Sequence, residues 1–303
     1  MGVVTGAAKK RRLEEEEEVE LLEDSISRPP DGVLGDIVSL LPSKNSARTK
    51  VLSSRWRHIW RSAPLNFDLG RPVLQSFRAT EISRILSSHL GPGRRFSIHT
   101  DYVYVERKDA AATLDAWILS RTLDNLQELE LRLSHTLDNP LPPLPAPVCR
   151  FSSTLRVASF ERCSFPDGNA SALHLPLLNK LTIACGRISE TSLHALLAGC
   201  SVLESLLLLN SHGFPRLQIV STSLISIGVC SRSGDDNKFR QLIIEDAPCL
   251  ERLLVFQHLE MENFGGTFYQ ITHTPFWHHQ GSGTSQHQSN FHLHEQSKVT
   301  LFA

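Results

Sequence analysis

Two tryptophans and five basic residues fall within the fourteen residues ARTKVLSSRWRHIW, which run from Ala47 to Trp60. Basic side chains beside aromatic rings suit nucleic-acid binding, because the cations contact phosphates and the rings stack on bases. The same residue types suit a helix that docks on another protein, since tryptophan and arginine often dominate interface affinity. The third interpretation is an amphipathic helix that packs its tryptophans into a core.

Residue patterns that support catalysis or metal binding are missing from the sequence. It contains no GxSxG nucleophile elbow, no GxxxxGK[ST] or GxGxxG phosphate loop and no HExxH zinc motif. Four histidines near the C-terminus have no neighbouring cysteine and match no zinc spacing; they are His278, His279, His292 and His294. We therefore predict no catalytic residue, no metal, no cofactor and no enzyme activity.

Composition restricts the partners and the compartment. The net charge is -1, so the chain as a whole does not attract nucleic acid or anionic lipid. No apolar run reaches the roughly 18–20 residues that span a bilayer, and we predict no membrane partner. The six cysteines are scattered without a CxxC pair, and no secretory signal precedes them. Reduced thiols of this kind indicate a cytoplasmic or nuclear protein, or both, and KKRR at residues 9–12 is a possible nuclear signal.

Three short helices must position the tryptophans and the basic residues. Residues 31–41 predict a first helix, because six apolar residues recur there at helical spacing, with Pro30 and Asp31 in its first turn. A second helix is expected from Ser46 to about Leu52. Ser53 then caps a third, which ends at Pro64. Three helices in about 40 residues make a small core, so we expect this unit to lean on a partner.

The position of the tryptophans separates the interpretations. Trp56 and Trp60 share the apolar face of the third helix with Ile59, whereas its arginines fall largely on the other faces. Residues 25–72 carry eight Lys/Arg against three Asp/Glu, a surplus that a DNA reader would need. Because the rings lie away from the basic face, docking on a protein is favoured. A helical nucleic-acid-binding protein that uses the Arg-rich segment 48–61 is the alternative.

The stretch ISRPPDGVLGDIVSLLPSKNSARTKVLSSRWRHIWRSAPLNFD resembles the F-box of plant F-box proteins. The resemblance implies docking on a Skp-type adaptor, and through it on a cullin, in an SCF-type ubiquitin ligase. By position, the adaptor-binding residues are Pro30, Leu34, Ile37, Leu41, Val51, Trp56 and Trp60. One departure is Pro29, which stands where the family usually has leucine. The proline removes an apolar anchor, and this predicts weaker adaptor binding by about 1–2 kcal/mol.

Downstream of residue 65, strand-like runs alternate with helix-like runs, and an apolar frame L-x-x-L-x-L recurs. The frame starts at residues 126, 155, 178, 203, 224 and 250, so the starts lie 29, 23, 25, 21 and 26 residues apart. Leucine-rich repeats have periods of 20–29 residues, and their frames form short parallel strands over a continuous core. Ser189 is expected to cap a helix over residues 189–200. An ordinary α/β domain with leucine-rich strands is the alternative.

These repeats resemble those of grass-type plant F-box proteins with leucine-rich repeats, here with a short or atypical C-terminus. The predicted fold class is α/β, with a small three-helix F-box followed by an irregular solenoid of short parallel strands alternating with helices. Four segments follow: a disordered charged tail (1–24), the F-box (25–64), the solenoid (65–256) and a disordered His/Gln/Ser-rich tail (257–303). The solenoid is expected to bind a protein target, which the sequence does not identify.

Overall fold

The structure is a computed structural model of the 303-residue chain. It describes residues 28–41, 43–69, 77–104, 109–134, 140–167, 173–231, 239–259, 268–275, 289–293 and 297–301; from residue 254 onward only the backbone is described. Two compact units divide the chain, and the boundary lies between Pro64 and Leu65. The charged tail expected at residues 1–24 lies outside the described residues.

The first unit is helical. It contains α2 (Asp31–Leu40), α3 (Ser43–Arg48), the 3₁₀ turn η2 (Thr49–Val51) and α4 (Ser54–Ser62). As predicted, the Ser53 side chain caps α4, accepting a hydrogen bond from the backbone N–H of Trp56 at 3.4 Å. The second helix starts three residues earlier than expected and tightens into η2. The small core consists of Leu34, Val38, Trp56, Ile59 and Ala63.

The second unit begins with strands and helices in alternation. Its first elements are β1 (Leu65–Asp68), β2 (Phe77–Arg78), α5 (Ala79–Ser88), β3 (Gly93–His99), η3 (Thr100–Tyr102), β4 (Val103–Tyr104), α6 (Ala110–Ile118), η5 (Arg121–Leu123), β5 (Glu128–Arg132) and η6 (Ala146–Phe151). The remaining elements are β6 (Val157–Glu161), β7 (Lys180–Ala184), α7 (Glu190–Ala198), β8 (Ser205–Leu209), β9 (Arg216–Val220), β10 (Ser226–Ser231), β11 (Gln241–Asp246) and β12 (Arg252–Leu259), followed by β13 (Phe268–Pro275), β14 (Ser289–Leu293) and β15 (Ser297–Leu301).

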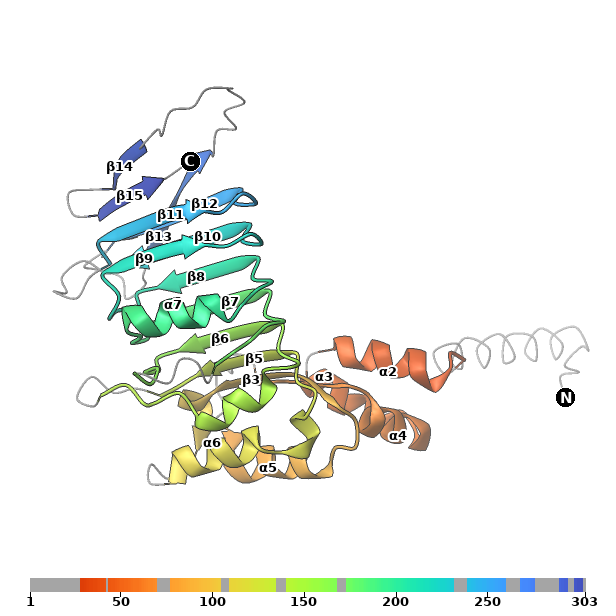
Figure 1. The fold of residues 1–303 in the computed structure, drawn as a ribbon. Helices are drawn as coiled ribbons and strands as arrows, with labels where there is room; N and C mark the ends of the chain where they lie inside the picture. Colours follow the sequence, from red (N-terminus) through yellow and green to blue (C-terminus); the bar gives the residue numbers. More distant parts are fainter. Residues whose placement is uncertain are drawn as a thin grey trace, which may run out of the picture. The chain divides into compact units, whose positions relative to one another are not determined.

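One sheet organises the second unit. Its nine strands follow the order β1-β3-β5-β6-β7-β8-β10-β12-β13, and the pairs from β1 to β12 are parallel. Figure 1 shows these strands stacked as successive rungs, with each turn of the chain adding one. A parallel sheet built from regular turns, with helices between its strands, is a leucine-rich-repeat solenoid. The fold class expected from the sequence is confirmed.

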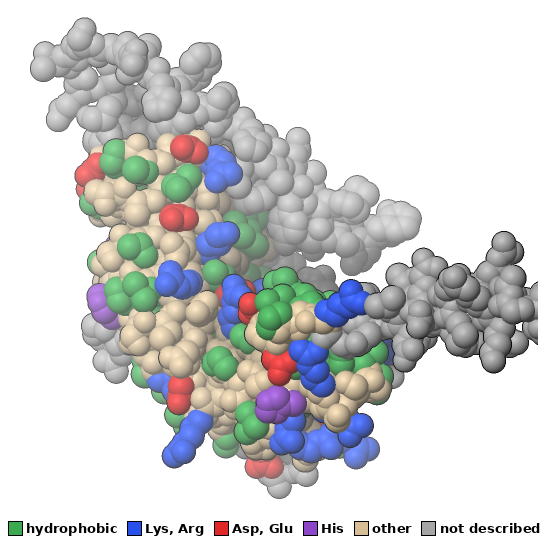
Figure 2. Space-filling view, turned by 90° about the vertical axis from the view of Figure 1, so that its right-hand side faces the viewer, with side chains coloured by type: hydrophobic (Ala, Val, Ile, Leu, Met, Phe, Trp, Pro, Cys, Tyr) green, Lys and Arg blue, Asp and Glu red, His purple; other side chains and the backbone are tan. Residues whose placement is uncertain are grey.

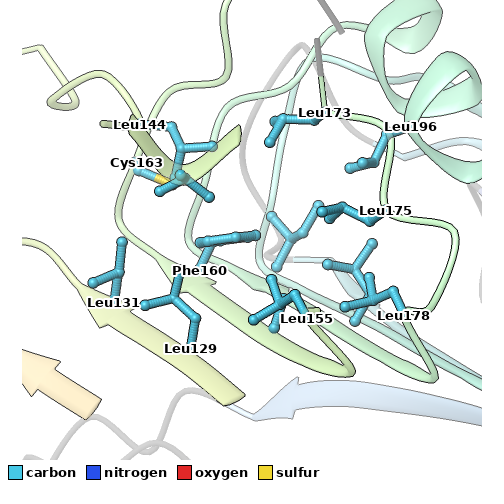
Figure 3. Packing of buried hydrophobic residues seen from close by; sticks show 14 of the residues in the cluster. Leu129, Leu131, Leu144, Leu155, Phe160, Cys163, Leu173, Leu175, Leu178 and Leu196 are labelled. Atoms are coloured by element: carbon cyan, nitrogen blue, oxygen red, sulfur yellow. The ribbon is translucent and has the colours of Figure 1, made fainter. Parts of the chain in front are cut away.

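The recurring apolar frame forms the core of the solenoid. Its second positions are aligned in register across six strands, in the order Leu129, Ala158, Leu181, Leu206, Ile227 and Leu253. All six are buried. Figure 3 shows how neighbouring columns meet, with Phe160 lying among leucines from adjacent turns. Because the second position of every frame falls on a strand and is buried, the spacing that predicted repeats is also what builds the core.

Three successive strands are each followed by a residue in the left-handed backbone conformation. Arg162, Cys185 and Asn210 directly follow β6, β7 and β8, with φ of 58°, 50° and 48°. The N–H of each donates to a carbonyl of the next turn, at 2.9, 2.7 and 2.8 Å, respectively. Side chains other than asparagine and aspartate rarely adopt this conformation. The turn geometry of the solenoid is therefore imposed by stacking, except at Asn210, where the residue type also favours it.

Opposite the large sheet, the solenoid changes from helices to strands. α5, α6, η6 and α7 cover the early turns, whereas β9 and β11 occupy the corresponding place in later ones and pair in parallel. The N–H groups of Arg216 and Gln218 in β9 donate to Glu190 Oε2 and His194 Nε2 of α7, at 3.3 and 3.1 Å. The last helix thus meets the first strand of this second sheet through its side chains.

The C-terminal segment contains short strands within the region that the sequence assigns to a tail from residue 257. β12 continues to Leu259, β13 pairs with it antiparallel, and β15 pairs with β11. Backbone groups at the end of a sheet favour such pairing, because the last strand otherwise leaves its N–H and C=O groups unpaired. The sequence FYQITHTP in β13 is rich in β-branched and aromatic residues, a local signal for a strand.

Candidate protein-docking site

The seven residues predicted to bind an adaptor occupy three different environments. Pro30, Ile37 and Val51 are exposed, and Leu41 and Trp60 are partly buried. Leu34 and Trp56 lie in the core of the helical unit, with only 1% and 5% of their surface accessible. The structure therefore brings the seven into one small unit but does not present all of them on its surface.

Helix α2 carries apolar residues on two faces. Leu34 and Val38 face the core, while Val33, Ile37 and Leu40 are 49%, 47% and 77% exposed. Residues 33, 37 and 40 have the i, i+4, i+7 spacing of one helix face. A helix that needs only to bury its inner face gains nothing from a second apolar face in water. The outer face of α2 is therefore a candidate contact surface.

A second exposed apolar site lies at η2 and just after it, where Val51 and Leu52 are 84% and 60% exposed. Together with the outer face of α2, these residues form what we call the exposed apolar set: Val33, Ile37, Leu40, Val51 and Leu52. Figure 2 shows hydrophobic side chains gathered on the surface next to lysine and arginine side chains. Apolar side chains with a polar surround are typical of protein–protein contacts.

Three members of this set escaped the sequence prediction, namely Val33, Leu40 and Leu52. The signal was present, because α2 has six apolar positions where one face needs three or four. Treating all six as a single stripe hid the second face. The resemblance names Leu34 and Trp56 as adaptor-binding residues, and both lie in the core of the three-helix unit. We expect them to affect a partner through the shape of the unit.

Arg55 ties the start of α2 to α4. Its Nε donates to Asp31 Oδ1 at 2.8 Å, and its Nη2 donates to the Pro29 carbonyl at 2.7 Å. Both side chains of the ion pair are partly exposed, so we expect it to orient the entry into α2 more than to stabilise the unit. The carbonyl of Pro29, which replaces the usual leucine, is thereby held in place.

The basic residues of the Arg-rich segment do not form a stacking platform with the tryptophans. Lys50 Nζ lies 3.9 Å from the centre of the Trp60 ring, and the Trp56 ring is buried. Arg57 and Arg61 are exposed on α4. Since single-stranded nucleic acids are held largely by stacking on accessible rings, this arrangement offers cations without the matching aromatic surface.

A second candidate surface is the outer face of the large sheet. Its side chains come from the strand positions that alternate with the buried core positions. On its first strands these side chains are charged. Arg95 Nη1 donates to Glu128 Oε2 at 3.1 Å, and its Nη2 donates to Glu130 Oε2 at 3.0 Å. Ser97 Oγ also donates to Glu130 Oε2, and His99 Nε2 lies 3.4 Å from Oε1. Arg95 and Ser97, both on β3, therefore hold Glu130 of the neighbouring strand β5 in place.

The charges continue across the next strand. Arg162 Nη1 donates to Asp101 Oδ2 at 2.9 Å, and Arg132 Nε lies 3.4 Å from Glu161 Oε1. We call the whole group the charged cluster: Asp68, Arg95, Asp101, Glu128, Glu130, Arg132, Glu161 and Arg162. Farther along the sheet most outer side chains are uncharged, such as Thr182, Leu207 and Cys230, and the exposed charged ones are the basic Lys180 and Arg252.

The buried thiols are poor nucleophiles. Burial raises the pKa of the Cys163 and Cys200 thiols to about 12. Burial, together with the nearby Cys185, raises that of Cys230 to about 11, although a hydrogen bond from the Asn210 backbone opposes this. These thiols are protonated at neutral pH, and only a thiolate attacks or binds metal readily.

Within the described residues, no three metal-binding side chains come together and no helix is long and apolar enough to cross a membrane.

Comparison with known families explains the repeats. Residues 114–290 match the family model described as "FBD-associated F-box protein At5g56370, LRR repeats". The chain belongs to the plant F-box/LRR-repeat proteins. The match runs from within α6 to the start of β14.

Individual F-box/LRR-repeat proteins are also similar to this chain in sequence. The chain is 33% identical over 195 residues to F-box/LRR-repeat protein At3g03360 of Arabidopsis thaliana, which covers 61% of this chain and 38% of the relative. It is 26% identical over 262 residues to F-box/FBD/LRR-repeat protein At1g13570 of the same plant, covering 80% and 56%. The chain thus spans between about two fifths and just over half the length of these relatives.

Proposed function

We propose that this chain is the substrate-recognition subunit of an SCF-type ubiquitin ligase. The helical unit would dock on a Skp-type adaptor, and through it on a cullin, while the solenoid would hold a target protein. Membership of the F-box/LRR-repeat proteins supports this role. The chain would contribute proximity between target and ligase, and the bond-forming chemistry would belong to other subunits. We place this role in the cytoplasm or nucleus, where free thiols such as its six cysteines stay reduced.

The exposed apolar set is the observation that carries the docking half of the proposal. A unit whose core has five residues leaves five other large apolar side chains between 47% and 84% exposed. Covering them on an adaptor would remove their apolar surface from water at about 25 cal/mol per Å². The same contact would supply the external support that so small a core needs.

Ile37→Asp tests this half directly. Ile37 is 47% exposed on the outer face of α2, so aspartate should leave the fold intact while placing a charge in the contact. We expect the affinity for a purified Skp-type adaptor to fall at least about thirtyfold, corresponding to ~2 kcal/mol. Isothermal titration would measure it.

Leu90→Asp is the matched control, because Leu90 is 73% exposed but belongs to the solenoid unit. It should bind the adaptor like the unaltered chain. Equal adaptor affinity for Ile37→Asp and Leu90→Asp would remove the outer face of α2 from the docking site.

A further inference from the structure

The charged cluster on the outer face of the solenoid has more acidic than basic side chains. It contains five carboxylates and three arginines. Arg95 is shared by three of the carboxylates, and Arg132 and Arg162 are shared by the other two. At neutral pH the cluster therefore carries two negative charges in excess. Such a surface attracts cations and repels acidic segments.

Three of the carboxylates each have one oxygen to spare. Glu128 is contacted only through Oε2, Asp101 only through Oδ2 and Glu161 only through Oε1, as far as the described part of the chain shows. Their side chains are 33%, 31% and 25% exposed, so solvent reaches them. A carboxylate oxygen accepts hydrogen bonds and donates none, which means that only a donor can occupy these positions.

The sheet sets the spacing of these acceptors. Glu128 pairs in register with Val157 of the neighbouring strand, and Glu161 lies four residues beyond Val157 in β6. With a rise of about 3.3 Å per residue and about 4.8 Å between strands, their Cα atoms lie roughly 14 Å apart. Asp101 lies near the same end of the strands as Glu161, because both contact Arg132 and Arg162. The spare oxygens thus lie at two ends of one strip of sheet.

An extended polypeptide matches this strip. In an extended chain, residues i and i+4 lie about 13 Å apart and their side chains point to the same side. Lysine and arginine are the donor-rich cations of proteins and bind carboxylates through charge-assisted hydrogen bonds. Farther along the sheet the outer positions of β7, β8 and β10 carry no carboxylate, and the exposed charged side chains there, Lys180 and Arg252, are basic. The preference for cations is therefore confined to the strip over β3, β5 and β6.

We propose that this strip binds an extended target segment carrying two basic side chains four residues apart, one at Glu128 and one at Asp101 and Glu161. The inference rests on the proposed role of the solenoid in holding a target. It adds to that role the chemical class of the segment and the place where it lies.

The test uses the full chain and three fluorescent peptides of Gly and Ser. The first carries two lysines four residues apart, the second carries glutamates at the same positions, and the third carries adjacent lysines. At low salt we expect the first to bind, with affinity falling as salt shortens the screening length from about 10 Å at 0.1 M to 3 Å at 1 M. The glutamate peptide should not bind, and adjacent lysines should bind several-fold more weakly.

Paired substitutions locate the site. Glu128→Gln with Glu161→Gln keeps the shape of both side chains and removes both charges, and should weaken binding of the first peptide about five- to thirtyfold. Glu245→Gln, at an exposed carboxylate on β11, is the matched control and should change nothing. Thermal melting would verify that each variant is folded.

Two results would overturn the inference: no binding of the spaced-lysine peptide up to about 1 mM, or binding that the double variant leaves unchanged. Adaptor affinity, measured on the same proteins, keeps this failure separate from the docking half of the proposed function. For the target-holding half, affinity capture from plant extract would compare the full chain with a full-length variant whose solenoid core is opened by Phe160→Ala. Proteins that need the solenoid for capture, alongside a failed peptide test, would overturn only the inferred target chemistry.

Discussion

The helical unit and the solenoid differ in how completely they bury their apolar side chains. Each turn of the solenoid places its frame residues against those of the next, so columns such as Leu181, Leu206 and Ile227 are almost fully buried without any partner. The helical unit has five core residues and leaves as many large apolar side chains in water. The contrast teaches that an unburied apolar residue is informative only when the unit that carries it has already filled its core.

The largest effect is expected from removing a ring in the solenoid core. Phe160 is fully buried and makes an edge-to-face contact with Phe165 at a centroid distance of 5.8 Å. Phe160→Ala should lower the free energy of unfolding of the solenoid by about 4–5 kcal/mol, because the closely stacked turns on either side cannot collapse into the cavity. Chemical denaturation would measure it, with Phe160→Leu as the conservative control. A loss under about 1 kcal/mol would mean that the columns are loosely packed.

The helical unit should respond separately. Trp56→Ala empties part of a five-residue core, and we expect a loss of about 3 kcal/mol in that unit together with strongly weakened adaptor capture. The melting of the solenoid should be unchanged, since the chain divides at Pro64. Differential scanning calorimetry, with Trp56→Phe for comparison, would resolve the two transitions. Undiminished adaptor capture by a folded Trp56→Ala chain would contradict any role of this core in docking.

A smaller effect is expected at Pro29, where leucine would add apolar area at the start of the docking unit. We expect Pro29→Leu to strengthen adaptor binding between about threefold and thirtyfold, or roughly 0.7–2 kcal/mol. The carbonyl at this position accepts from Arg55 in either case, so the entry into α2 should keep its course. Titration against purified adaptor decides the sign, and equal or weaker binding would show that proline suits the contact as well as leucine does.

The smallest effect is expected on the binding of the chain to DNA. If the helical unit docks on protein, retention on a DNA column should be weak and should change little when Arg57 and Arg61, both exposed on α4, are replaced by glutamine. Steep salt dependence that diminishes in the double variant would instead favour the nucleic-acid alternative, because each phosphate contact releases a counterion.

The sequence predicted best what repeats or what capping residues determine. The second and third positions of each frame fell on β5, β6, β7, β8, β10 and β12, and the serine caps of α4 and α7 accept the expected backbone hydrogen bonds. These features depend on short-range spacing, which the sequence displays directly. The two faces of α2 were harder, because Leu34 and Ile37 are alike in residue type and differ only in what the rest of the unit leaves uncovered.

The remaining features arise from stacking and pairing between turns. The left-handed conformations of Arg162 and Cys185 have no signature in their residue types, since the neighbouring turn imposes them. The charged cluster brings together residues that are far apart in the sequence; Asp101 and Arg162, for example, are 61 positions apart. Such pairings depend on the order of strands in the sheet, which the repeat spacing suggests but a single motif does not contain.

The contact between α7 and β9 bears on how copies of this protein behave at high concentration. A strand at the border of a sheet can recruit a strand from a second molecule, and repeated recruitment yields fibres. In β9, the N–H groups of Arg216 and Gln218 are already engaged by Glu190 and His194 of the preceding helix. Because α7 already bonds these N–H groups, it blocks strand pairing at the β9 edge of the second sheet. This hinders head-to-tail polymerisation of the chain from that side.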